Sequence, residues 1–170
     1  LMSYLKLIAN PSDDEAFRRA IGAPRRGVGD TTVEWLAERA RTENLSLFAA
    51  ASRADILAEM RAAARTALSA FVALIEKYRA DIDEYAVDEL IKEIVIDINY
   101  AEFLRSDGEE AARERLENVR ELISGAGETV VDEGGEDGTS PLDTFLQRAA
   151  LVADVDALRQ ADADAITLMT

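Results

Sequence analysis

The amino-acid sequence predicts an all-α domain. Apolar side chains recur at helical spacing through most of its 170 residues, as expected for helices that bury one face. Two stretches also carry the Ser/Thr-x-x-Glu pattern of a helix N-terminal capping box. A chain of this length can bury a hydrophobic core without disulfides or metals. We therefore expect one helical domain of roughly seven to nine helices.

The first two helices are predicted from their apolar faces and their end signals. A helix over residues 1–10 ends before a proline, because proline disfavours the helical conformation of the preceding residue. The next helix begins at a capping box, with Ser12 as the cap and Glu15 reaching back to it. Gly22 and Pro24 end this helix.

The third helix follows a short turn that contains two glycines. Asp30 or Thr31 is its expected cap, since Thr31 to Glu34 repeats the capping box. The inward-facing residues of this helix are Val33, Leu36, Ala37 and Ala40. The predicted arrangement is a helix-hairpin-helix-like element.

Further helices are predicted along the rest of the chain. A short one is expected at residues 45–48, a long alanine-rich one at 58–79 and a buried one at 87–98. A charged amphipathic helix is expected at 109–124, and another opens at Pro141. The glutamates of the charged helix alternate with arginines, which indicates a solvated face rather than a metal site.

Two segments do not follow the helical pattern. Residues 125–140 hold five of the nine glycines together with several acids, which predicts a mobile acidic loop. Those acids do not keep the spacing of an EF-hand calcium loop. Residues 164–170 are mostly apolar, as is typical of a strand buried on both faces of a parallel sheet. We expect that strand to belong to a missing α/β domain.

Composition excludes several kinds of chemistry. The chain has a net charge of −15 and contains neither cysteine nor histidine. Disulfides, thiolate nucleophiles, zinc–cysteine sites and histidine bases are therefore impossible. Within this acidic chain, residues 18–29 contain Arg18, Arg19, Arg25 and Arg26 and no acid. No apolar run is long enough to span a bilayer and no signal peptide is evident, so we expect a cytoplasmic protein.

The turn between the second and third helices is the candidate site. Its two glycines flank one apolar residue that can turn inward, and they let another molecule approach the backbone. The free amides and the positive dipole of the following helix form an anion site, with two arginines beside it. We predict that this stretch binds duplex phosphates without reading base sequence. Its residues are Arg25, Arg26, Gly27, Val28, Gly29, Asp30, Thr31 and Thr32.

Five segments, in the same order, resemble the UvrD/PcrA/Rep group of bacterial superfamily-one DNA helicases. The glycine-containing turn is similar to the duplex-contacting "GIG" motif of that family, with Val28 in place of isoleucine. The resemblance covers nearly the whole chain. The five segments are residues 4–14, 24–32, 45–48, 115–118 and 166–170.

The resemblance implies a division of the chain. Residues 11–161 would form a 2B subdomain, which is a mostly helical insertion in motor domain 2A of these helicases. Residues 1–10 would be a helix at the edge of 2A. Residues 162–170 would be a 2A strand that leads into a truncated motif V.

The resemblance also implies a function for the parent protein. It would be an ATP-dependent 3′-to-5′ DNA helicase of repair or replication, with ATP and Mg²⁺ as cofactors. Its 2B subdomain would bind duplex DNA at a single-strand/double-strand junction and contact the 1A, 1B and 2A domains. This chain lacks the G-x-x-x-x-G-K-[ST] loop that binds nucleotide phosphates. Alone, it is expected to have no catalytic, cofactor or metal residues and to be inactive.

Other interpretations stay open from the residues alone. Gly-Val-Gly is also the pattern of a tight turn with solvated arginines beside it. The acidic helices and residues 125–140 would suit a module that docks a repair, replication or transcription protein. A hydrolase that uses paired carboxylates has little support, because no acid pair stands out from the general acidity.

Overall fold

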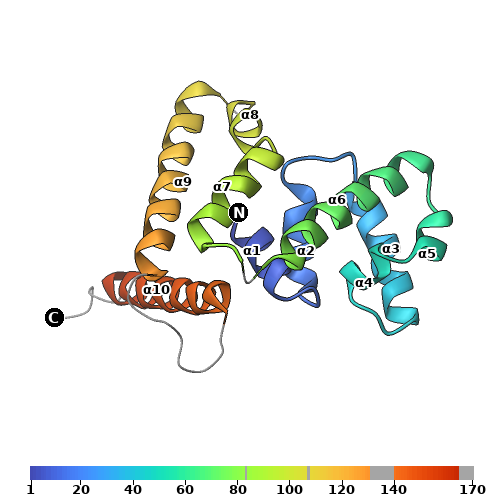
Figure 1. The fold of residues 1–170 in the computed structure, drawn as a ribbon, viewed down its shortest axis with the longest axis horizontal. Helices are drawn as coiled ribbons and strands as arrows, with labels where there is room; N and C mark the ends of the chain where they lie inside the picture. Colours follow the sequence, from blue (N-terminus) through green and yellow to red (C-terminus); the bar gives the residue numbers. More distant parts are fainter. Residues whose placement is uncertain (83, 107, 131–139, 165–170) are drawn as a thin grey trace.

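The computed structural model describes residues 1–82, 84–106, 108–130 and 140–164 (Figure 1). Every regular element in these ranges is an α-helix, which confirms the predicted fold class. There are ten of them in the described ranges, more than predicted. In chain order they are α1 (Met2–Ala9), α2 (Asp14–Gly22), α3 (Asp30–Thr42), α4 (Leu47–Ala51), α5 (Ala54–Ala58), α6 (Ala62–Ala80), α7 (Val87–Asp97), α8 (Tyr100–Arg105), α9 (Glu109–Val130) and α10 (Pro141–Asp164).

An aromatic cluster lies among the N-terminal helices, contributed by α1, α2 and α6. Tyr4, Phe17 and Phe71 are each at most 2% exposed. The ring centroids of Phe17 and Phe71 are 5.4 Å apart and those of Tyr4 and Phe71 are 6.3 Å apart, both edge-to-face. Helix α1 packs on α2 and α6, and α4 packs on α2, α3 and α6. The cluster therefore joins α1 and α2, the helix before the glycine-containing turn, to α6, whereas α3 is linked to α6 through α4.

Helices α7 to α10 form the other end of the molecule (Figure 1). Helix α9 packs along α7 and α8, and α10 contacts α7, α9 and α1. Leu142 and Phe145 of α10 are buried in the same apolar cluster as the residues of α1. The last helix thus returns to the first and ties the two ends of the molecule together.

A polar cluster joins α6 to α7. The Tyr78 side chain is fully buried, and its hydroxyl donates to Asp97 Oδ2 at 2.7 Å. Lys77 Nζ donates to the same oxygen at 2.7 Å and lies 3.8 Å from Glu93 Oε2. The hydrogen bonds from Lys77 and from Tyr78 lower the pKa of Asp97, while burial raises that of Tyr78. Asp97 is therefore held as a carboxylate at neutral pH.

The start of α2 differs from the prediction. Asp13, not Ser12, is the N-cap, and its Oδ1 accepts from Ala16 N at 2.8 Å. Glu15 does not reach back to the cap, because it pairs with Arg19 one turn along at 2.6 Å. The end of α2 at Gly22 agrees with the prediction.

Helix α9 is longer than predicted. It runs to Val130, so Gly125 and the residues after it are helical where a loop was expected. Ala126 is fully buried, and a Cβ atom added at Gly127 would lie 3.7 Å from Asp88 Cγ of α7. Close packing against α7 extends the helix despite its two glycines, which have low helix propensity.

The remaining predictions concern the long helix and the chain's end. Helix α6 begins at Ala62, later than predicted, because residues 54–58 form the separate helix α5. Residues 162–164 are helical in α10 rather than part of a strand. The rest of the predicted loop (131–139) and strand (165–170) lies outside the described residues. Among the helices that the structure describes, none combines the length and apolar character needed to cross a membrane.

Candidate nucleic-acid interface

Residues 23–29, here called the glycine turn, connect the end of α2 to the start of α3. Gly27 has a φ angle of +74°, a left-handed conformation that glycine adopts without strain. Val28 is partly buried and packs against the apolar core, as the sequence predicts. Gly29, with φ −87° and ψ 169°, occupies the N-cap position of α3. The turn therefore has one inward side chain between two glycines.

Arg26 also points inward. Its Nη1 donates to Ala20 O at 3.1 Å and to Pro24 O at 2.9 Å. Its guanidinium carbon lies 5.2 Å from the ring centroid of Phe71 and 5.5 Å from that of Tyr4. Arg26 thus attaches the glycine turn to the aromatic cluster. Its positive charge is already engaged by two backbone carbonyls and two aromatic rings.

Tyr4 supports the same segment from α1. Its single hydroxyl proton is shared between two acceptors, Ala20 O at 2.9 Å and Ala23 O at 2.8 Å. Burial raises the pKa of Tyr4 to about 12, so the hydroxyl keeps its proton at neutral pH. In the sequence, the only signal for Tyr4 is its position on the apolar face of the first helix.

The outward side of the turn is open. Arg25, Gly27, Gly29, Asp30 and Thr31 are exposed. A Cβ atom added at either glycine would meet nothing within 4 Å, so no part of the described chain covers this backbone.

The first turn of α3 has no side-chain cap. Neither Asp30 nor Thr31 serves as the cap, which corrects the prediction, because both already lie inside the helix. The amides of Thr32 and Val33 donate to Gly29 O, at 2.9 and 3.2 Å. The amides before them point out of the helix end and are available to an anion. The Asp30 carboxylate would repel such an anion, so an anion site here also needs the positive charge of nearby arginines.

The arginines around the turn are not equivalent. Arg18 and Arg25 are exposed, and neither forms an ion pair within the part of the chain that the structure describes. Arg19 is paired with Glu15, and Arg26 is used internally. Arg25 also borders an open groove of about 730 Å³ whose opposite wall includes Glu102 of α8.

A protein-family model of the UvrD-like helicase C-terminal domain matches residues 1–170. The chain belongs to this family. It is 37% identical over 175 residues to the ATP-dependent DNA helicase PcrA of Bacillus subtilis, and 34% identical over 176 residues to that of Staphylococcus aureus strain Mu50. It is 30% identical over 172 residues to that of Leuconostoc citreum. Each comparison covers 100% of this chain and 23% of the relative, so the chain spans less than a quarter of these proteins.

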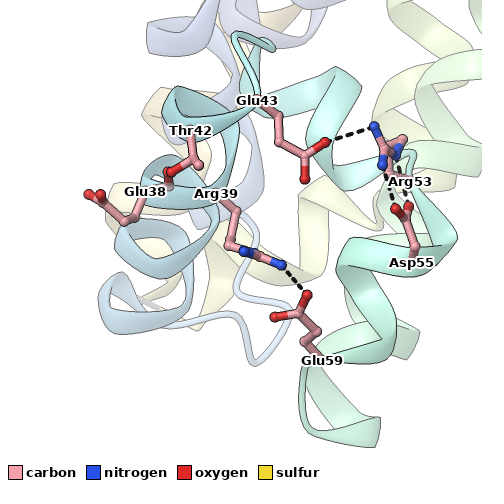
Figure 2. Close-up of polar contacts among 7 residues, drawn as sticks. All are labelled: Glu38, Arg39, Thr42, Glu43, Arg53, Asp55 and Glu59. Atoms are coloured by element: carbon pink, nitrogen blue, oxygen red, sulfur yellow. Dashed lines mark hydrogen bonds and ion pairs between the residues drawn. The ribbon is translucent and has the colours of Figure 1, made fainter.

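Ion pairs fix α3 against its neighbours in this UvrD-like domain (Figure 2). Arg39 of α3 pairs with Glu59, which follows α5. Arg53 pairs with Glu43 at 2.9 Å and also with Asp55, which lowers the pKa of the Asp55 carboxyl. Exposed pairs of this kind each contribute little to stability, and here they connect α3 and the residue after it to the segment around α5.

A hydrogen-bonded contact between α2 and α4 adds to this support. Asp14 Oδ1 accepts from Leu47 N at 2.7 Å, and Ser46 Oγ donates to Pro11 O at 3.2 Å. The Asp14 side chain therefore accepts a hydrogen bond from the first residue of α4 rather than from its own helix. Within the described ranges, no group of three or more acidic side chains is placed to hold a metal ion.

Proposed function

We propose that this chain is the 2B-type accessory part of an ATP-dependent 3′-to-5′ DNA helicase, in which the glycine turn and the start of α3 hold duplex DNA by its phosphates. The support comes from membership of the UvrD-like family and from relatives that are named ATP-dependent DNA helicase PcrA. The motor activity, with ATP and Mg²⁺, would reside in the rest of the protein. Duplex at a single-strand/double-strand junction would be the ligand of this part.

The open outward face of the glycine turn carries the proposal. Backbone amides at an uncapped helix start and an exposed arginine hold phosphates by charge and hydrogen bonds, without contacting base edges. Arg25 and the amides that follow Gly29 would make these contacts. Arg26, Tyr4 and Val28 would act as positioning residues, because their side chains face the core. With about two to four phosphates held, log K falls with log[salt] at a slope of about −2 to −4.

The test uses the full-length protein and a labelled duplex with a single-stranded tail. Gly29→Ser is the sharpest variant, because the space around this position is open and serine is a favoured N-cap. Its hydroxyl oxygen would accept from the amides that a phosphate needs. We expect duplex affinity to fall about tenfold, the range for a lost hydrogen bond to a charged group, without loss of folding stability.

Two controls make this test specific. Gly125→Ser on α9 is the matched control, since a Cβ atom there also meets nothing within 4 Å. ATP hydrolysis stimulated by single-stranded DNA should be unchanged in both variants. Equal losses of duplex binding and of this ATPase activity in Gly29→Ser would refute the proposal.

Protein docking is a second candidate function, favoured by one observation. Leu151 and Val152 are consecutive on α10 and are 66% and 61% exposed. Large apolar side chains left exposed on a helix are candidates for contact with a partner protein. Replacing both with serine should leave duplex affinity unchanged if docking and DNA binding use separate surfaces.

A further inference from the structure

A second open site adjoins the glycine turn. A cleft of about 320 Å³ lies between the first turn of α3 and the segment that joins α5 to α6. Thr31, Thr32 and Trp35 line it from α3, and Met60 and Arg61 line it from the opposite side. Because both threonines also belong to the candidate phosphate site, the cleft continues that site along the surface.

The charges in the cleft favour an anion. Arg61 directly precedes α6, is exposed, and forms no ion pair within the described ranges. The one acid in the wall, Glu59, is paired with Arg39 (Figure 2). Arg65 is exposed one turn further along α6. The cleft therefore contains Arg61, a cation without an ion-pair partner in the described ranges, whereas the negative charge of Glu59 is neutralised by Arg39.

The other lining groups match a sugar–phosphate backbone better than a free phosphate ion. The hydroxyl groups of Thr31 and Thr32 can donate hydrogen bonds to phosphate oxygens. Trp35 and Met60 provide an apolar surface of the kind against which a deoxyribose can lie. A ligand with alternating anionic and apolar parts would satisfy both kinds of group.

We propose that this cleft holds a second segment of the DNA backbone, with Arg61 as its phosphate-binding residue. The inference rests on the proposed function, because it assumes that the neighbouring glycine turn holds the same DNA. It adds a contact from α6, far along the chain from the turn. The strand would pass from the amides after Gly29, over the two threonines, to Arg61.

The first test is the salt dependence of duplex binding by full-length Arg61→Gln. Loss of one phosphate contact should make the slope of log K against log[salt] shallower by about 0.9. If that contact contributes nothing at 1 M salt, affinity falls about 15-fold at 50 mM salt and about fourfold at 200 mM. Arg61→Lys should recover most of the loss, because it keeps the charge. Arg113 is an exposed arginine on α9, and as a control the Arg113→Gln variant should bind the duplex like the unmodified protein.

The second test locates the phosphate. Methylphosphonate linkages remove the charge of one phosphate at a time from the duplex. At one linkage, the substitution should weaken binding by the unmodified protein but not by Arg61→Gln, while linkages held by the glycine turn should still matter in Arg61→Gln. Equal sensitivity of the two proteins at every linkage would overturn the inference.

Comparison with Gly29→Ser separates the two proposals. A loss in Gly29→Ser with normal binding and slope in Arg61→Gln would overturn this inference and leave the proposed function standing. Normal binding in both variants would overturn both. Circular-dichroism melting curves of each variant should show no loss of stability relative to the unmodified protein, since both positions are exposed.

Discussion

The two ends of the molecule differ sharply in charge. Residues 1–80, which form α1 to α6, contain 12 lysines and arginines against 10 aspartates and glutamates, whereas residues 81–170 contain 7 against 24. The first part carries the glycine turn and the cleft. The second part carries all of the excess negative charge.

This difference changes the meaning of the net charge. A total of −15 argues against nucleic-acid binding only if the acids surround the binding surface, because exposed charges more than a Debye length away, about 8 Å at physiological salt, are largely screened. Here the helices around the glycine turn are close to neutral. If the glycine turn binds DNA as proposed, the acidic helices would help to keep the DNA on one end of the domain.

The largest expected effect tests how the near-neutral end is held together. Arg26→Ala removes two hydrogen bonds to backbone carbonyls and the contacts with two aromatic rings. We expect a loss of about 2 kcal/mol in the free energy of unfolding, measured by urea denaturation. Duplex affinity should fall as well, because the glycine turn loses its attachment.

Arg25→Ala is the matched control for that variant. This exposed arginine should contribute less than about 0.5 kcal/mol to stability, although it should weaken duplex binding. If Arg25→Ala destabilised the domain as much as Arg26→Ala, the assignment of the two arginines to different roles would be wrong.

A smaller effect is expected where the two ends meet. Tyr78→Phe removes the hydroxyl that donates to Asp97 and should cost about 1 kcal/mol in unfolding free energy. Since the pKa of Asp97 is lowered in the folded state, its contribution is present above the unfolded value of about 3.9 and is lost as pH falls through the folded value.

The pH dependence checks the same contact. Stability should therefore decrease below about pH 4, and this acid-dependent part should be smaller in Tyr78→Phe and in Lys77→Met. Urea denaturation between pH 2 and 7 measures it. An unchanged pH profile in both variants would show that Asp97 does not couple α6 to α7.

The smallest expected effect asks which acids oppose DNA. Glu102 borders the same groove as Arg25, whereas Glu121 lies on the second half of α9. Glu102→Gln should raise duplex affinity about twofold at low salt, the size expected for two surface charges about 8 Å apart in water. Glu121→Gln should leave it unchanged. An equal gain in both would mean that total charge matters more than its position.

The sequence predicted most of the helices because an amphipathic helix such as α2 or α7 buries a regular apolar face, whereas the short helix α5 was not predicted. The exact ends of the helices were harder to predict from the residues near them. Ser12 and Asp13 are both good cap residues, and only the path of the chain into α2 selects Asp13. The extension of α9 past Gly125 follows from packing on α7, which no local pattern reveals.

The candidate site was predicted only in part. Its position between two helices and the inward Val28 agree with the sequence analysis. That Arg26 turns inward and Arg25 outward depends on Tyr4 and Phe71, which lie far from the turn in the chain. Arg61 was not singled out, because the predicted long helix began before it and thereby hid the segment that forms the cleft. DNA binding itself stays a prediction.

The cleft has a built-in optical probe. Trp35 is the sequence's single tryptophan, it is partly buried in the cleft wall, and the Arg39 guanidinium carbon lies 5.9 Å from its ring centroid. Indole emission depends on solvent contact and on nearby charge, so anything that enters the cleft should change its wavelength or intensity. The intrinsic fluorescence of Trp35 would thus report a ligand in the cleft without any added label.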